Sequence, residues 1–315
     1  MKKYNSIDTK IKFFLKSNLI TKIKILMNIL GLKKIIYNII YFFLSFIFKR
    51  NSYFMKGILF DLQKNQSELI GVNTHHDEKF VLFTHDKVIS KEIFLKEEFD
   101  INKLNKTIDF LKQKKTIKNL YDIGANIGVI CIPAVKRNLV KKAIAIEPEP
   151  KNFELLKANI ALNNLENKIS TYNYAISNVD DESVEMELAK NNFGDHRVKQ
   201  IINFNLKGEE NRKTIKIKTR KFDNLFNKID SNHDLVWIDT QGHEVKILEG
   251  AENLINSKAP IVIEFWPYGL KRNGDWEKIF NIIKKFHYYV DLSKDNLYAE
   301  EINDQSINKL KIDWD

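Results

Sequence analysis

Two short turns in the middle of the chain carry the residue types of a nucleotide-binding site. The first is Tyr121-Asp-Ile-Gly-Ala-Asn-Ile-Gly128, in which glycines directly follow a short apolar stretch. Glycine lets backbone N–H groups approach a ligand closely, and a helix that starts after the turn adds its positive end. The second is Glu147-Pro148-Glu149, nineteen residues beyond Gly128, where a carboxylate can accept hydrogen bonds from both hydroxyls of a ribose. Together they predict a site for an adenosyl group.

The spacing of the glycines argues against a dinucleotide. The fingerprint G-x-G-x-x-G, counted from Gly124, requires glycines where this chain has Asn126 and Val129. The missing second glycine is the one that makes room for a pyrophosphate. No phosphate loop of the form G-x-x-x-x-G-K-[ST] occurs. We therefore expect S-adenosyl-L-methionine as the cofactor, with a nicotinamide-dependent oxidoreductase as the alternative.

The segments around these turns alternate between strand and helix patterns. Strands are predicted over 119–123, 143–146, 168–172, 234–238 and 260–263, and helices over 103–115, 127–138, 151–163 and 244–256. This alternation predicts an α/β fold, in which a mostly parallel, doubly wound sheet is covered on both faces. The stretch 177–226 interrupts the pattern with at least one further strand, over 214–217. Both turns then lie at the carboxyl ends of strands, where such sheets bind ligands.

Several further motifs accompany the two turns. They are DIGANIG at 122–128, IEPEP at 146–150, AIS at 175–177, DTQGHE at 239–244, LEGA at 248–251 and Glu264 at the end of a strand. With them the chain resembles the FkbM family of class I S-adenosylmethionine-dependent methyltransferases over about 119–266, and more loosely over 80–118. Many members have Glu where this chain has Gln241. The resemblance implies a Rossmann-like class I methyltransferase fold and methylation of oxygen, often of a sugar hydroxyl.

The resemblance also implies which residues bind the cofactor. It places Glu147, with Pro148 beside it, at the ribose, and Ala175 next to the adenine. The methionine part of the cofactor would lie in the turn formed by Asp122, Gly124, Ala125, Asn126 and Gly128.

Three residues are candidates for catalysis, because methyl transfer to a hydroxyl needs an aligned acceptor and a group that takes its proton. Asp239 ends a strand, where it can reach the transfer point or cap the following turn. His243 has an ordinary pKa suited to proton removal, or is an exposed loop residue. Glu264 ends a buried strand, where a charge needs a partner, and is expected to orient the acceptor.

Three more residues are candidates for binding the acceptor. Glu244 opens a predicted helix, where a carboxylate also stabilises the helix dipole. His196 and Arg197 end the sequence Asn192-Phe-Gly-Asp-His-Arg197, which is either a lid over a polar acceptor or a solvated hairpin turn. No metal is expected, because the histidines at 75, 76 and 85 match no zinc-binding spacing.

The net charge of +10 is confined to the start of the chain. Residues 1–50 carry eleven Lys and Arg and one acid, whereas the remainder carries 40 residues of each sign. A neutral body argues against a nucleic-acid methyltransferase, and no nucleic-acid partner is expected. The single cysteine, Cys131, excludes an internal disulfide and favours a cytoplasmic location.

Residues 1–50 are predicted to form a basic, hydrophobic helical arm. Apolar residues recur at helical spacing over 11–30, and a fourteen-residue apolar stretch follows at 35–48. As a helix this stretch would be about 21 Å long, which is short for a bilayer core of roughly 30 Å. The arm is therefore expected to lie on the cytoplasmic face of a membrane, or to pack on the body or on a second copy in a homo-oligomer.

The domain organisation expected from these patterns has three parts. The arm covers 1–50, a small α+β prefix covers 51–115, and the methyltransferase domain covers 116–315. In the prefix, strands are predicted at 57–60, 80–83 and 92–95. We expect a small-molecule or glycan acceptor, most plausibly a sugar or lipid-linked saccharide hydroxyl. A module that binds the cofactor without catalysis is the second alternative.

Overall fold

The computed structural model describes residues 32–47, 53–199 and 212–313. The chain divides into two compact units, residues 1–68 and 69–315. The helix predicted within 11–30 lies outside the described residues, and the functional boundaries at 50 and 115 stay a prediction. Across the described ranges, no helix combines the length and the apolar character needed to cross a bilayer.

The first unit contains helices α3 (Leu32–Ile47) and α4 (Tyr53–Gln63). The strand predicted at 57–60 was wrong, because this segment lies inside α4. A run of four apolar residues fits a buried strand or a buried helix equally well. Met55 and Leu59 are buried and stand four residues apart, which is helical spacing.

The second unit begins with the part of the predicted prefix that follows residue 68, and the name prefix is kept below for this part. A hairpin of β1 (Leu69–Asn73) and β2 (Lys79–Phe83) is followed by α5 (Ile89–Lys96) and α6 (Ile101–Leu111). The strand at 80–83 is confirmed, but the one predicted at 92–95 was wrong. That segment is helical because the Asp86 carboxylate accepts hydrogen bonds from the backbone N–H groups of Val88 and Ser90, at the start of α5.

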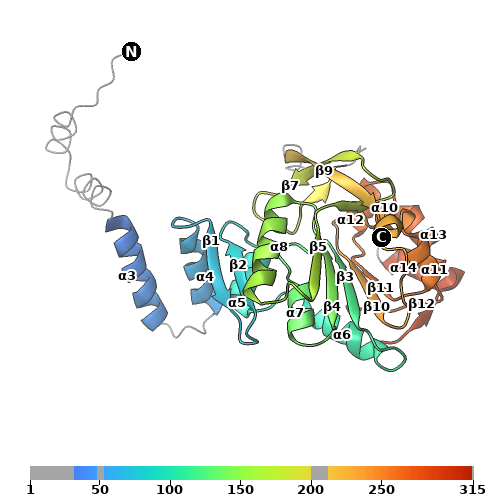
Figure 1. The fold of residues 1–315 in the computed structure, drawn as a ribbon, viewed down its shortest axis with the longest axis horizontal. Helices are drawn as coiled ribbons and strands as arrows, with labels where there is room; N and C mark the ends of the chain where they lie inside the picture. Colours follow the sequence, from blue (N-terminus) through green and yellow to red (C-terminus); the bar gives the residue numbers. More distant parts are fainter. Residues whose placement is uncertain (1–31, 48–52, 200–211, 314–315) are drawn as a thin grey trace, which may run out of the picture. The chain divides into compact units, whose positions relative to one another are not determined.

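The main sheet of the second unit has five parallel strands, as Figure 1 shows. Its order is β11-β10-β3-β4-β5, formed by Ile261–Ile263, Asp234–Ile238, Asn119–Ile123, Lys142–Ile146 and Ile169–Tyr172. The α/β prediction is therefore confirmed. Strand β3 pairs with β4 on one side and with β10 on the other, so the chain order reverses there.

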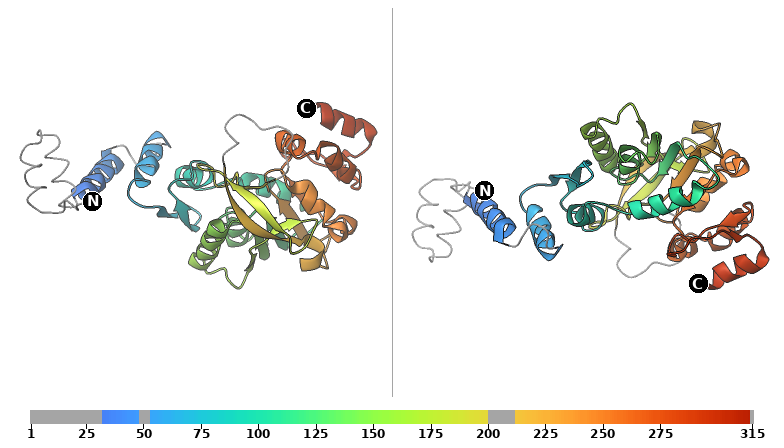
Figure 2. Two further views of the ribbon diagram at one scale, coloured as in Figure 1. Left: turned by 90° about the horizontal axis from the view of Figure 1, so that it is seen from above. Right: turned by 90° about the horizontal axis from the view of Figure 1, so that it is seen from below.

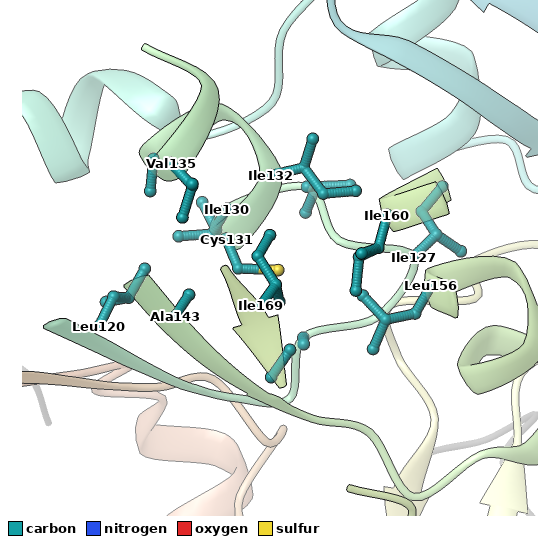
Figure 3. Close-up of a cluster of buried hydrophobic side chains, with 14 of the residues drawn as sticks. Leu120, Ile127, Ile130, Cys131, Ile132, Val135, Ala143, Leu156, Ile160 and Ile169 are labelled. Atoms are coloured by element: carbon teal, nitrogen blue, oxygen red, sulfur yellow. The ribbon is translucent and has the colours of Figure 1, made fainter. Parts of the chain in front are cut away.

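The two faces of this sheet carry separate hydrophobic cores. Successive residues of β3 point to opposite faces, so that Leu120 belongs to one core and Tyr121 to the other. Figure 3 shows part of the first core, a cluster that joins Leu120 and Ala143 of the sheet with residues of α7 (Cys131–Lys136) and of α8 (Pro150–Leu162). The second core includes residues of α10 (Glu244–Glu249), α11 (Glu252–Ser257) and α13 (Trp276–Ile283).

The helices that cover the sheet begin and end close to the predicted positions, with two differences. Helix α7 (Cys131–Lys136) starts later than the predicted residue 127, because the glycine turn extends to 130. The single helix expected over 244–256 is two helices, α10 (Glu244–Glu249) and α11 (Glu252–Ser257). They separate at Gly250, where any Cβ atom would overlap the backbone oxygen of Ser177.

The stretch 177–226 adds a second sheet of order β6-β9-β7-β8. Its described strands are Ala175–Ser177, Lys213–Lys221, Ser183–Leu188 and Arg197–Val198. Strand β9 contains the strand predicted at 214–217, and the yellow strands in Figures 1 and 2 show this sheet near one end of the parallel strands. The remaining elements are α8 (Pro150–Leu162), α9 (Phe222–Leu225), α12 (Pro267–Arg272), α13 (Trp276–Ile283), β12 (Tyr288–Tyr289), β13 (Glu300–Glu301) and α14 (Asp304–Asp313).

Candidate cofactor and acceptor site

A pocket of about 830 Å³, including its open mouth, lies at the carboxyl ends of β3, β4 and β10. This is the point of the sheet where the chain order reverses, and open α/β sheets bind ligands there. Nine of the fourteen candidate residues line it. They are Asp122, Gly124, Asn126, Glu147, Pro148, Ala175, His196, Asp239 and His243.

The turn after β3 has a backbone that explains its glycines. Gly124 and Gly128 have φ values of 91° and 95°, and Asn126 has a φ of 51°. Glycine enters this left-handed region freely, and asparagine does so more readily than most residues. A Cβ atom at Gly124 would also overlap the backbone oxygen of Asp239, so the loops after β3 and β10 touch at this glycine.

Glu147 connects the two turns that the sequence singles out. Its side chain is buried, and its two oxygens accept hydrogen bonds from the backbone N–H groups of Asn126 and Glu149, both at 2.8 Å. Burial raises the pKa of Glu147 to about 8, although the two N–H groups lower it. Each carboxylate oxygen has a second acceptor direction, so both remain available to ribose hydroxyls.

The other residues of the turn mainly fix its shape. Asp122 accepts a hydrogen bond from the backbone N–H of Cys131 at 3.1 Å, which ties β3 to the start of α7. Burial raises the pKa of Asp122 to about 7. The N–H of Ala125 donates to the carbonyl of Ile146. Ala125 and Gly128 do not line the pocket, so they contribute to the conformation of the turn and not to the pocket surface.

Part of the pocket wall is apolar. Ala175 and Ile176 of β6 line it, together with Met186 of β7 and Val198 of β8. The pocket thus combines a buried carboxylate, a glycine turn with close backbone approach and an apolar wall. These features fit the ribose, the methionine part and the adenine of S-adenosylmethionine, respectively.

At the end of β10, two carboxyl groups are joined by an amide. The Gln241 side-chain N–H₂ donates to Asp239 Oδ1 at 2.9 Å and to Glu264 Oε2 at 2.7 Å. Burial raises the pKa of both carboxyl groups, and the charge of Asp239 helps to raise that of Glu264 to about 8. Asp239 lines the pocket, whereas Glu264 does not. The sequence did not mark Gln241 as a site residue.

His243 is buried, with 7% of its surface exposed, so the alternative of an exposed loop histidine was wrong. It lines the pocket, and its Nε2 lies 3.2 Å from the Ser177 hydroxyl. Burial, and then the charge of Lys246, lowers the pKa of His243 to about 4. The ring is therefore neutral at pH 7 and is a weak base.

Glu244 supports the loop between β10 and α10 and does not line the pocket. Its Oε1 accepts hydrogen bonds from the backbone N–H and hydroxyl of Thr240 and from the N–H of Gly242, at 3.0–3.2 Å. Burial raises the pKa of Glu244 to about 7. It therefore holds the backbone that carries Gln241 and His243.

The turn 192–197 contributes to the pocket lining. Its residues 192–196 are half-buried, and Arg197 is buried. His196 lines the pocket, and burial, and then the charge of Arg212, lowers its pKa to about 4. Arg197 does not line the pocket: it is 2% exposed and pairs with Glu187 at 3.2 Å. Glu187 also pairs with Arg272 at 3.1 Å, so Arg197 anchors the turn.

Several pocket residues could not be singled out from the sequence. Phe99 and Asp100 line the pocket from the prefix, and Asn152, Phe193 and Gly194 line it from α8 and the 192–197 turn. No motif marks Phe99, Asp100 or Asn152, because packing of distant segments brings them there. Phe193 and Gly194 lie in the segment that the sequence singled out, but only His196 and Arg197 were candidates in it. Among the described residues, no group of three or more His, Cys, Asp or Glu side chains is arranged to hold a metal ion.

Comparisons with known proteins agree with this geometry. The family model described as "Methyltransferase FkbM domain" matches residues 122–291, which is more than half of the chain. A comparison with curated proteins returns no match.

Three solved structures are similar at low identity. An FkbM methyltransferase from Methylobacillus flagellatus is 17% identical, with a TM-score of 0.36, and the match covers 56% of this chain but only 39% of that one. TYW2 from P. horikoshii, in complex with MeSAdo, is 16% identical with a TM-score of 0.34 and coverage of 71% and 62%. Precorrin-6y C5,15-methyltransferase from Geobacter metallireducens is 10% identical with a TM-score of 0.34 and coverage of 63% and 82%.

At these TM-scores the solved structures carry no argument about the substrate. The assignment of the chain to a family rests on the family model and on the site. The match sets the nicotinamide-dependent oxidoreductase aside. It is also consistent with either a small-molecule or a macromolecular acceptor. The chain belongs to the FkbM methyltransferase domain family and is a methyltransferase that uses S-adenosyl-L-methionine.

Proposed function

We propose that the enzyme methylates a hydroxyl group of a sugar or of a lipid-linked saccharide, with Asp239 as the general base. The observation that carries this proposal is the Asp239–Gln241–Glu264 group at the pocket wall. A hydroxyl must lose its proton as the methyl group is transferred, and a carboxylate whose pKa is raised by burial is a stronger base than an exposed one. His243, with its pKa near 4, is less suited to this role.

The state of the two carboxyl groups supports this assignment. Two like charges held close together in a buried site do not both ionise readily, so the pair holds a proton near neutral pH. Glu264 has a pKa raised to about 8 and does not line the pocket, so we assign the proton to Glu264. Asp239 then faces the pocket as the carboxylate, and Gln241 fixes its orientation.

The charges around the mouth support a neutral, hydroxylated acceptor. Asp100 and Asp239 both line the pocket, and the charge of Asp100 raises the pKa of Asp239. The Lys103 ammonium pairs with Asp100 at 2.9 Å. A wall of carboxylates accepts hydrogen bonds from sugar hydroxyls and repels an acceptor that carries phosphate or carboxylate at its reactive end.

The cofactor pocket completes the arrangement. Glu147, the turn 122–128 and the wall around Ala175 would hold S-adenosylmethionine, which supplies the methyl group on a positively charged sulfonium. The residues of this chain align the acceptor, exclude water and remove its proton.

The test is methyl transfer from radiolabelled S-adenosylmethionine to a panel of neutral, amino and uronic-acid methyl glycosides, with mass spectrometry to locate the added 14 Da. We expect incorporation on an oxygen of a neutral glycoside, and a loss of at least 100-fold in kcat for Asp239→Asn with unchanged cofactor binding. Methylation on nitrogen of the amino glycosides, or full activity of Asp239→Asn, would refute the proposal. A chain that binds the cofactor but methylates no acceptor in cell extracts would favour the non-catalytic alternative.

We also propose that helix α3 places the enzyme on an anionic membrane surface. Ile35, Ile39, Phe42 and Phe43 on this helix are 50–69% exposed. Lys33 and Lys34 belong to the first turn of this helix, and Lys49 and Arg50 follow it in the sequence. Exposed aromatic and aliphatic side chains flanked by basic residues are typical of helices that lie in the lipid headgroup region.

Flotation of the full chain with vesicles of phosphatidylcholine, with and without phosphatidylserine, tests this location. We expect binding that requires phosphatidylserine and is lost in Phe42→Asp/Phe43→Asp. Leu162→Asp is the matched control, because Leu162 is a 43% exposed residue on α8. If the double variant instead dissociates a dimer in the absence of vesicles, α3 packs on a second copy and the membrane proposal fails.

A further inference from the structure

We propose that Asn152 is a further cofactor-binding residue. Its side-chain oxygen accepts a hydrogen bond from a ribose hydroxyl of S-adenosylmethionine, while its side-chain N–H₂ holds the Phe193 carbonyl beside the pocket. The proposal requires the cofactor only and is independent of the acceptor.

The first observation is where Asn152 stands. It lies in the first turn of α8, five residues after Glu147, and its side chain lines the pocket. Its backbone N–H donates to Glu149 Oε2 at 2.7 Å, which caps the helix and fixes the residue in place. Only 1% of the residue is exposed. The side chain is therefore held rigidly, next to the carboxylate assigned to the ribose.

The second observation is an unsatisfied acceptor. The Nδ2 group donates to the Phe193 carbonyl at 3.3 Å, which fixes which end of the amide is the oxygen. The Oδ1 atom is buried and has no hydrogen-bond partner among the described residues. Leaving a buried acceptor unsatisfied costs about 1–3 kcal/mol. Because the side chain faces the pocket, a donor on the cofactor can supply the missing bond.

The third observation identifies the donor. Asn126 donates its side-chain Nδ2 to the same Phe193 carbonyl at 3.0 Å, and its backbone N–H binds Glu147 Oε2 at 2.8 Å. Asn126, Asn152 and Glu147 therefore form one hydrogen-bonded corner of the pocket. The carboxylate in this corner suits the ribose hydroxyls, whereas the adenine amino group belongs at the apolar wall around Ala175. The geometry points to a ribose hydroxyl as the donor to Asn152.

The Phe193 carbonyl explains why an amide is needed. The backbone N–H of Phe193 donates to Asp86 of the prefix at 3.3 Å, and its ring packs on Phe83, with 4.9 Å between ring centroids. The 192–197 turn is thus held by the prefix on one side and by Asn126 and Asn152 on the other. An amide is the side chain that donates to this carbonyl and accepts from the ribose at the same time.

The test is the affinity of the full chain for S-adenosylhomocysteine, the reaction product, and for its 2′-deoxy and 3′-deoxy analogues, measured by calorimetry. We expect Asn152→Ala to weaken binding of the product about tenfold, or about 1.4 kcal/mol. One deoxy analogue should bind the wild type about tenfold more weakly than the product does. Asn152→Ala should bind that analogue and the product equally.

Asn163→Ala is the matched control. Asn163 ends the same helix, is 3% exposed and donates to the backbone carbonyl of Lys79 at 2.8 Å, but it does not line the pocket. The control should lower the melting temperature and keep the tenfold preference for the product over the deoxy analogue.

Asn152→Asp keeps the acceptor oxygen and loses the donor to Phe193, so it should bind more weakly overall and keep the preference for the hydroxyl. It also covers the case in which Asn152→Ala does not fold. Equal losses for the product and both analogues in Asn152→Ala would assign Asn152 a structural role only. Loss of the hydroxyl preference in Asn152→Asp would likewise refute the contact. Because wild-type binding of the product tests the cofactor site separately, failure here leaves the proposed acceptor chemistry untouched.

Discussion

Gly124 is the residue on which the shape of the cofactor site most depends. Its φ is 91°, and a Cβ atom would overlap the backbone oxygen of Asp239, which cannot move without shifting β10. We expect Gly124→Ala to abolish binding of S-adenosylhomocysteine and to lower the free energy of unfolding by about 1–3 kcal/mol. Calorimetry and denaturant unfolding measure the two effects.

Gly71→Ala is the control for this substitution, because a Cβ atom there meets nothing within 4 Å. It should leave cofactor binding unchanged. Product binding within threefold of wild type in Gly124→Ala would show that the turn is not part of the site.

Glu147 makes cofactor binding depend on pH. In the ligand-free protein its pKa is about 8, so the carboxyl group is mostly protonated at pH 7. Ribose hydroxyls donate to the ionised form and favour it. Binding should therefore release a proton, and the Kd for S-adenosylhomocysteine should fall by up to about tenfold per pH unit between pH 6 and 8.

Calorimetry in buffers of different ionisation enthalpy measures how many protons are released when S-adenosylhomocysteine binds. Glu147→Gln cannot ionise at this position, so subtracting its pH dependence isolates the contribution of Glu147. Equal pH dependence in the two proteins would remove Glu147 from the ribose site.

At the scale of elements, charged residues at the start of α6 change the pKa of Asp239, the proposed base at the end of β10. The Asp100 charge raises the pKa of Asp239, and the Lys103 charge lowers it. Activity requires ionised Asp239 and falls as the pH is lowered through its pKa. We expect Asp100→Asn to move this acid limb to lower pH and Lys103→Met to move it to higher pH, in plots of kcat against pH.

Asp109→Asn is matched to Asp100→Asn. Asp109 stands on the same helix and pairs with Lys112 at 2.7 Å with the same three-residue spacing, but it does not line the pocket. The acid limb in the plot of kcat against pH should be the same for Asp109→Asn as for the wild type. Shifts of the same sign in Asp100→Asn and Lys103→Met would contradict Asp239 as the base.

At the scale of the whole molecule, buried carboxyl groups make the ligand-free protein less stable as the pH rises. Burial raises the pKa values of Asp122 and Glu244 to about 7 and those of Glu147 and Glu264 to about 8. Between the ordinary values near 4 and these values, the folded state binds more protons than the unfolded state. The free energy of unfolding then falls with pH, by at most about 1.4 kcal/mol per pH unit for each group.

Thermal unfolding between pH 5.5 and 8.5 at constant ionic strength measures this loss. The melting temperature should decrease over the range, and less steeply in Glu147→Gln. Saturating S-adenosylhomocysteine should raise it more at pH 8 than at pH 6, because the ligand favours ionised Glu147. A melting temperature that rises from pH 6 to pH 8 would show that these groups are not buried as described.

The sequence by itself determined the alternation of strands and helices and the place of the cofactor. The strands predicted at 119–123 and 234–238 have these bounds in the structure, because strands buried on both faces are rich in apolar residues, such as Leu120 in the first and Leu235–Ile238 in the second. The glycines after β3 and the acidic residue after β4 could be recognised in the sequence, because a turn whose backbone approaches a ligand closely permits few residue types.

Only the tertiary structure decided which short apolar segments are helices. The segments at 57–60 and 92–95 lie in α4 and α5, and the pattern of four residues does not separate helix from strand. It also decided which polar side chains meet at the pocket. Asp100, Asn152 and Phe193 come from three distant segments, and their meeting depends on long-range packing that no local spacing encodes. Local sequence rules thus predict the longer elements and the glycine turn, whereas the pocket lining that includes Asp100, Asn152 and Phe193 forms only once the prefix and the second sheet have packed on the parallel sheet.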